Sequence, residues 1–218
     1  MSIKAYFSEK LEKLLFLNIK DEDVYLPIKS TSLINDIKSG HNFDEIPFSY
    51  FIEGMFFILG ADEDFKYKES YLKIINKTDE SVKFIKGKIA EEIKNQNYED
   101  SYILLKGLSI IEKSEEVFDK LILVLETLRE KSDVFKEEEL KILESVKNID
   151  KYSTPYYYEA LIKREDKDYR GALISINRFL DLSGQNSNDL LAFRDSILKS
   201  LNYETGKALI YDDPKGAI

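Results

Sequence analysis

The sequence predicts an all-α fold built from helix-turn-helix pairs. Three observations lead to this prediction. Apolar residues recur at helical spacing after Phe43, short polar breaks with helix-capping residues interrupt them about every dozen residues, and aromatic residues mark the turns at a repeating interval. No clear strand alternation interrupts the helical pattern after Phe43.

Four helix pairs are predicted within residues 47–186. Pro47 and Pro155 suit a first helical turn, and Thr78 and Ser114 are capping residues followed by acids. The segment Asn186-Ser187-Asn188-Asp189 marks a further helix start in the same way. The predicted pairs are 47–60 with 64–77, 79–95 with 98–112, 115–130 with 134–148, and 155–166 with 168–183.

Aromatic residues at the turns give the length of the repeat. Phe65, Tyr98 and Tyr169 are separated by 33 and then 71 residues, close to one and two repeats of about 34 residues. The segment 155–184 carries Tyr156, small residues at Ala160 and Ala172, a turn at Asp168-Tyr169, and apolar positions at Ile176, Phe179 and Leu180. In this pattern the segment resembles the tetratricopeptide repeat (TPR-like) family, and the segment from Ile85 repeats it more weakly. The resemblance implies a right-handed α-solenoid of TPR-like helix-turn-helix repeats.

The chain is predicted to contain three regions: residues 1–46 as an N-terminal helical cap, 47–186 as four TPR-like helix pairs, and 187–218 as a long helix with the start of a truncated further repeat. In the cap, a first helix is predicted from an apolar stripe at Ile3, Phe7, Leu11, Leu14 and Leu15. A second short helix carries Leu33, Ile34 and Ile37 and ends at Gly40. Residues 24–28 between them could be extended instead.

The last residues predict that the chain ends inside a repeat. Asp213-Pro214-Lys215-Gly216-Ala217-Ile218 parallels the turn and helix start at 168–173. The preceding segment has an apolar stripe that a further helix would cover, so self-association through the truncated C-terminal repeat is one expected outcome. The stripe consists of Leu190, Phe193, Ile197, Leu201, Ala208 and Tyr211.

Composition excludes several classes of function. The 218 residues include no cysteine and one histidine, His41, so disulfides and transition-metal sites are not expected. The formal net charge of -9 opposes binding to phosphate backbones, so nucleic acid is not an expected partner. The N-terminus lacks a signal-peptide pattern, and charges interrupt every hydrophobic stretch before membrane-spanning length. We therefore expect a cytoplasmic protein without membrane contact, metal or cofactor.

The sequence gives only weak evidence for catalytic residues. The acidic runs Asp21–Asp23 and Glu137–Glu139 are interpreted as solvated charges, because consecutive helical residues point in different directions. Asp62-Glu63-Asp64 lacks the glycine and the distant glutamate of a calcium loop, and the glycines occur singly rather than in a phosphate-binding cluster. His41 is predicted to lie in a turn. No catalytic residue is assigned, and the chain is not expected to be an enzyme.

The TPR-like resemblance implies which residues line a binding groove, because the first helix of each pair lines the concave surface in that family. The positions are Lys83, Lys86 and Lys94 on one helix, and Tyr157, Leu161 and Arg164 on another. Their basic residues are either ordinary solvated side chains or a strip that favours an acidic partner. Tyr158 and Leu161 replace the asparagines of the family's carboxylate clamp, so that mode of binding is not expected.

The function expected from this pattern is a protein-protein interaction module that binds a peptide or protein segment in the concave groove. The alternative is a regulatory protein that senses a peptide or metabolite in the groove and has its output region outside this sequence. An attached output domain would distinguish the alternative from the first hypothesis.

Overall fold

The structure is a computed structural model that describes residues 2–18, 24–40 and 46–212, with side chains described as far as residue 207. The described residues form twelve helices and one two-stranded sheet, which confirms the predicted all-α class in its main feature. None of the helices in these ranges is both long and apolar enough to span a lipid bilayer.

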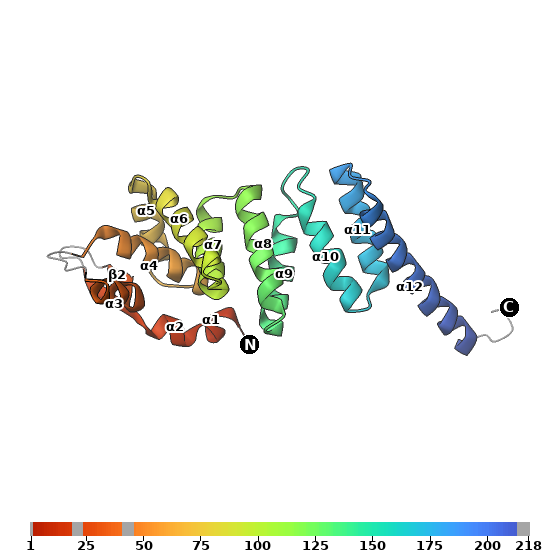
Figure 1. Cartoon of the computed structure of the whole chain (residues 1–218), viewed down its shortest axis with the longest axis horizontal. Helices are drawn as coiled ribbons and strands as arrows, with labels where there is room; N and C mark the ends of the chain where they lie inside the picture. The colour runs from red at the N-terminus through yellow and green to blue at the C-terminus, as the bar shows by residue number, and fades with distance from the viewer. Residues whose placement is uncertain (1, 19–23, 41–45, 213–218) are drawn as a thin grey trace. The chain divides into compact units, whose positions relative to one another are not determined.

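The chain divides into two compact units, residues 1–139 and 140–218, and the boundary falls inside helix α9 (Asp133–Val146) (Figure 1). The second unit contains α10 (Thr154–Glu165), α11 (Tyr169–Ser183) and α12 (Asn188–Asp212). The elements of the first unit before α9 are α1 (Ile3–Tyr6), α2 (Ser8–Glu12), β1 (Leu14–Asn18), β2 (Tyr25–Lys29), α3 (Ser30–Lys38), α4 (Phe48–Ala61), α5 (Lys68–Lys77), α6 (Ser81–Lys94), α7 (Tyr98–Ile111) and α8 (Glu115–Arg129).

The eight helices predicted in pairs correspond to α4 through α11. Their ends agree to within four residues, and the largest difference is the later start of α5. The cap at Ser114 is confirmed, because its hydroxyl oxygen accepts a hydrogen bond from the Val117 N–H at 3.4 Å. The cap at Thr78 is wrong: Thr78 ends α5, and Glu80 precedes α6 in a left-handed conformation with φ of 62°.

The N-terminal region differs from the first of its two predicted helices, whereas the second, with Leu33, Ile34 and Ile37, is confirmed as α3. The chain forms only short helices α1 and α2, and Leu14 and Leu15 then enter strand β1 instead of continuing a helical stripe. Strand β1 pairs antiparallel with β2, with Leu15 opposite Ile28 and Phe16 opposite Pro27. The extended alternative for residues 24–28 is therefore confirmed. Tertiary packing explains the change, because β2 lies against α4, where the Pro27 carbonyl approaches the backbone at Gly54.

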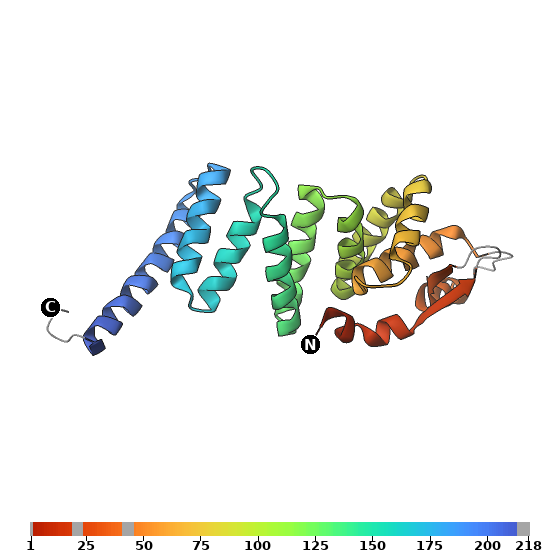
Figure 2. The same cartoon turned by 180° about the vertical axis from the view of Figure 1, so that it is seen from behind.

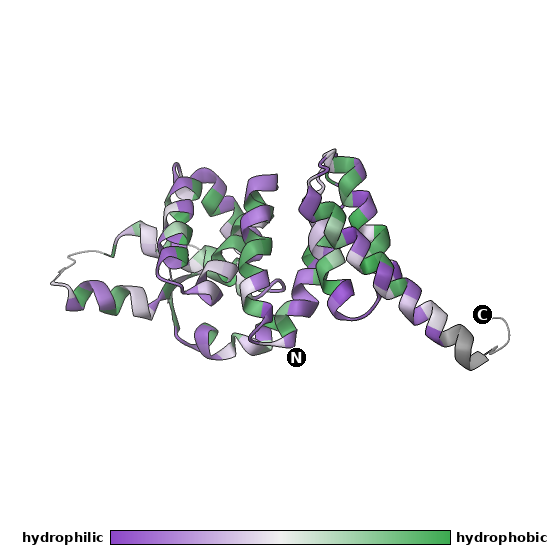
Figure 3. Ribbon diagram, turned by 45° about the vertical axis from the view of Figure 1, so that its right-hand side comes forward, coloured by the Kyte–Doolittle hydropathy of each residue, from purple (hydrophilic) through white to green (hydrophobic). Residues whose placement is uncertain are grey.

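Helix α4 is the centre of the first unit. Its ten residues from Ile52 to Ala61 are all buried, as expected for a helix that is apolar on nearly every side. Helices α5 and α6 lie on one side of α4, and the N-terminal segment with α1, α2 and α3 lies on the other (Figures 1 and 2). Other helices alternate between polar and apolar positions, the pattern of partly exposed helices (Figure 3).

Glycines let α4 and α7 approach each other closely. A Cβ atom on Gly60 would lie 1.8 Å from the Ile103 carbonyl oxygen, and one on Gly107 would lie 2.3 Å from the Phe56 carbonyl oxygen. Helix α4 consequently packs mainly on α7 and only lightly on α5. Helix α5, the predicted pair partner of α4, therefore contacts it only lightly.

The second unit contains the best-matched repeat. Helix α11 packs closely on α10 and also contacts α12. Ala160 and Ala172, the predicted small residues, are completely buried in a cluster with Ile176 and Ile197. Gly184 ends α11 with φ of 66°, a conformation that glycine adopts without strain. The two small residues thus lie in the buried cluster where α10 and α11 pack together.

Replacing Ala172 by leucine is expected to destabilise the protein by about 1–3 kcal/mol, because the larger side chain overpacks the buried cluster between α10 and α11. The measurement is urea denaturation followed by circular dichroism. Ile174→Leu, two residues away on α11, is the control, because Ile174 is 65% exposed. Equal midpoints for the two variants would contradict the prediction.

Candidate functional site

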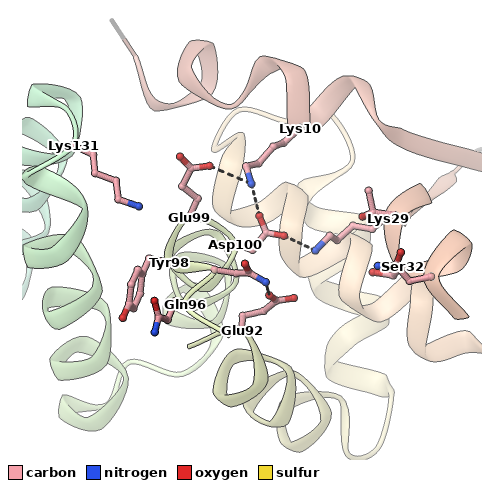
Figure 4. A pocket seen from close by; sticks show the side chains of 12 residues that line it. Lys10, Lys29, Ser32, Glu92, Gln96, Tyr98, Glu99, Asp100 and Lys131 are labelled. Carbon is pink, nitrogen blue, oxygen red and sulfur yellow. Dashed lines mark hydrogen bonds and ion pairs between the residues drawn. The ribbon is translucent and has the colours of Figure 1, made fainter. Parts of the chain in front are cut away.

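A polar groove lies in the first unit between the β2–α3 segment and the turn that joins α6 to α7 (Figure 4). It consists of two cavities with volumes of 420 Å³ and 380 Å³. The cavities share four lining residues, Ser32, Asn35, Glu92 and Asn97, so they form one continuous groove. We call this feature the polar groove.

Amide side chains are the main chemical feature of the groove. Asn35 comes from α3, and Asn95, Gln96 and Asn97 form the turn between α6 and α7. Gln96 has φ of 60°, and Asn97 precedes α7 and donates a hydrogen bond to Glu92 at 2.7 Å. A side-chain amide carries both donors and an acceptor, so the groove is lined by groups of both kinds.

Charged residues from distant parts of the chain meet at Asp100, in the first turn of α7. Lys10 Nζ lies 2.6 Å from one carboxylate oxygen of Asp100, and Lys29 Nζ lies 2.7 Å from the other. Lys10 also pairs with Glu99 at 3.2 Å, and Lys29 pairs with Glu53 at 3.3 Å. The dashed lines of Figure 4 show how Asp100 joins α2, β2 and α7. This network fixes one wall of the groove.

The network shifts the pKa values of its members. Burial alone would lower the pKa of Lys29, but the nearby charges of Glu53 and Asp100 outweigh burial and raise it. Burial would also lower the pKa of Lys10, but its interactions with Asp100 and Glu99 outweigh burial and raise it. For Asp100, burial would raise the pKa, but the two lysines lower it. All three groups are therefore held in their charged forms.

The second cavity has a more acidic wall. The Tyr50 hydroxyl donates a hydrogen bond to Asp36, and burial together with this bond raises the pKa of Tyr50 to about 12. Ser32 donates to Glu53 at 3.2 Å, which links α3 to α4. Lys131 lies at the opposite end of the groove, where its ammonium group is 5.9 Å from the centre of the Tyr98 ring. The groove therefore has an acidic wall in one cavity and Lys131 at the opposite end.

The lysines predicted for the concave groove all lie on α6 in the first unit. Lys83 pairs with Glu80 on the surface at 3.1 Å, and Lys86 pairs with Glu112 at 2.8 Å. Lys94 is exposed near the C-terminal end of the helix. These lysines are absent from the residues that line the polar groove.

The other predicted groove residues lie on α10 in the second unit. Tyr157 packs against Phe179 at 5.3 Å and Phe193 at 6.1 Å between ring centres, and Arg164 lies 5.2 Å above the Phe193 ring. Leu161 is partly buried. The structure thus brings Tyr157 and Arg164 together around Phe193 of α12.

The acidic run Glu137–Glu139 differs in part from its predicted solvated state. Glu138 and Glu139 are buried, so that interpretation is wrong for them, whereas Glu137 is exposed. Glu138 accepts a hydrogen bond from the Tyr102 hydroxyl at 3.0 Å and pairs with Lys106. The buried charge is compensated by these partners.

The remaining candidates are Asp62, which the structure describes, and three segments that it does not. Asp62 is also buried and pairs with Lys4 at 2.7 Å. Asp21–Asp23, His41 and the C-terminal motif 213–218 lie outside the described residues.

Comparison with protein-family models, curated proteins and solved structures finds no match to this chain.

Proposed function

We propose that the chain is a protein-interaction module that binds an extended peptide segment in the polar groove. The observation that supports this proposal is the set of amide side chains at Asn35, Asn95, Gln96 and Asn97 along one continuous groove. Peptide groups repeat a donor and an acceptor along an extended chain, and side-chain amides can pair with both. The proposal assigns no reaction to the groove.

The lining favours a peptide over a small apolar ligand. Sites for drug-sized ligands are mostly apolar with few polar groups, whereas the larger cavity is lined almost entirely by polar and charged residues, with Tyr98 as its aromatic member. Lys131 beside Tyr98 gives this end a positive charge, which suits an acidic residue of the peptide. We therefore propose a peptide partner with an acidic residue at this end.

We also propose that the helix pairs form a TPR-like solenoid. The α10–α11 pair supports it through its buried small residues Ala160 and Ala172 and its short turn. The first unit gives weaker support, because α4 packs chiefly on α7 and not on α5, its predicted partner in a helix pair.

A peptide-selection experiment tests the function. The chain is used to select binders from a phage-displayed library of random linear peptides, and binding of a selected peptide is measured by fluorescence anisotropy. Asn35→Trp places a bulky side chain in the shared part of the groove and is expected to weaken binding by about tenfold or more.

Ile37→Trp is the matched control, because Ile37 is also exposed on α3 but is absent from the lining of both cavities. This variant is expected to bind like the original chain. Failure to select any peptide, or equal losses in the two variants, would contradict the proposal.

A further inference from the structure

Strand β1 exposes an apolar edge in the first unit. Leu15, Phe16 and Leu17 are 49%, 41% and 42% exposed. Within the described residues, the sheet contains only β1 and β2, so the edge of β1 away from β2 has no third strand. None of the β1 residues lines the polar groove, so this edge is separate from the proposed peptide site.

The register identifies which backbone groups face the open edge. Ser30 N–H donates to the Lys13 carbonyl at 3.4 Å, which makes this opposed pair a hydrogen-bonded one. Because hydrogen-bonded and non-hydrogen-bonded pairs alternate, Phe16 and Pro27 form a non-hydrogen-bonded pair, as the missing N–H of proline requires. Leu14, Phe16 and Asn18 therefore direct their N–H and C=O groups away from β2.

The edge lacks the usual protection against strand pairing. Natural edge strands are commonly shielded by a lysine, a proline or a bulge, because their unpaired backbone groups bind other strands. The sequence of β1, Leu-Leu-Phe-Leu-Asn, contains no charge and no proline, and its register with β2 is continuous. Strand addition is therefore favoured at this edge.

We propose that β1 pairs with β1 of a second copy of this chain to form a continuous four-stranded antiparallel sheet. A two-fold axis at Phe16 aligns the outward residues as Phe16 with Phe16 and Leu14 with Asn18. Leu15 of one copy then lies opposite Leu17 of the other on one face of the sheet. Each exposed leucine of β1 thus meets another leucine, so the strand is complementary to itself.

Since the paired area is small, the expected dissociation constant is about 1–100 µM.

Analytical ultracentrifugation of the full chain over a range of concentrations tests the proposal. The original chain is expected to pass reversibly from monomer to dimer. Leu15→Lys/Leu17→Lys places lysines opposite lysines across the junction and is expected to remain monomeric. Leu15→Glu/Leu17→Lys places each glutamate opposite a lysine of the second copy, so this variant is expected to dimerise again.

The matched pair of variants separates register from simple loss of apolar surface, because both replace the same two leucines. Circular dichroism melting confirms that each variant folds, and Leu123→Lys on α8, which removes another exposed leucine, is expected to leave dimerisation unchanged. A monomer at every concentration overturns the proposal and leaves the edge for a strand of a different protein. A dimer of the double-lysine variant, or a folded monomer of the charge-paired variant, also overturns it.

Discussion

Replacing Gly60 by alanine is expected to destabilise the first unit by about 3 kcal/mol or more, although it adds only one methyl group. The added Cβ atom would lie 1.8 Å from the Ile103 carbonyl oxygen and 2.7 Å from its carbonyl carbon. Both atoms belong to the backbone of α7, so no side-chain rotation relieves the overlap. Helices α4 and α7 must separate, and packing around both helices is lost.

The measurement is the midpoint of urea denaturation, followed by far-ultraviolet circular dichroism. Gly87→Ala is the control, because Gly87 lies inside α6 and a Cβ atom there meets nothing within 4 Å. That change is expected to stabilise the protein by about 0.5–1 kcal/mol, since alanine favours a helix more than glycine does. The same substitution thus has opposite expected signs at two helical glycines. A Gly60→Ala variant as stable as Gly87→Ala would show that α4 and α7 do not cross closely.

The sequence was sufficient to predict α4 through α11, because local signals determine these helices. Apolar spacing, Pro155 near the start of α10 and Ser114 before α8 all act within a few residues of the helix that they define. The pairing of helices depends on distant contacts instead. In the sequence Gly60 and Gly107 are isolated glycines, and no local signal indicates that they meet across α4 and α7.

The N-terminal strands show a similar limit. Leu14, Leu15 and Leu17 are good helix formers, and nothing nearby in sequence indicates that β2 pairs with them. Pairing in the structure depends on β2 lying against α4, which is a tertiary effect. The extended segment around Pro27 was predictable as an alternative because proline disfavours a helix interior.

The polar groove could not be predicted because its walls come from separate parts of the chain. Lys10 and Asp100 are 90 positions apart, and Lys29 and Asp100 are 71 apart. The Asn95-Gln96-Asn97 turn was the available local signal, and the helix pattern explained it as a simple break between helices. The TPR-like resemblance predicts groove residues on α6 and α10, whereas the polar groove lies where α3 faces the α6–α7 turn.

Replacing Asp100 by asparagine is expected to destabilise the first unit by about 3 kcal/mol, because the substitution leaves Lys10 and Lys29 without their shared anion. Lys29 is 8% exposed, so water compensates its charge poorly, although Glu53 remains as a partner. Urea denaturation at neutral pH measures the loss. Glu80→Gln, which removes one partner of the exposed pair with Lys83, is the control and is expected to cause no measurable change.

The pH dependence of stability gives the same network a second test. The pKa of Asp100 is lower in the folded protein than its unfolded value of 3.8, so its contribution is present above pH 3.8 and is lost as the pH falls through the folded value. The pKa values of Lys10 and Lys29 are raised above 10.5, so their contribution is present below pH 10.5 and is lost as the pH rises through the folded values. Asp100→Asn is expected to flatten the acid limb and to reduce the loss of stability at alkaline pH, because the lysines lose the charge that raised their pKa above the unfolded value. An unchanged pH profile in this variant would show that Asp100 does not hold the two lysines together.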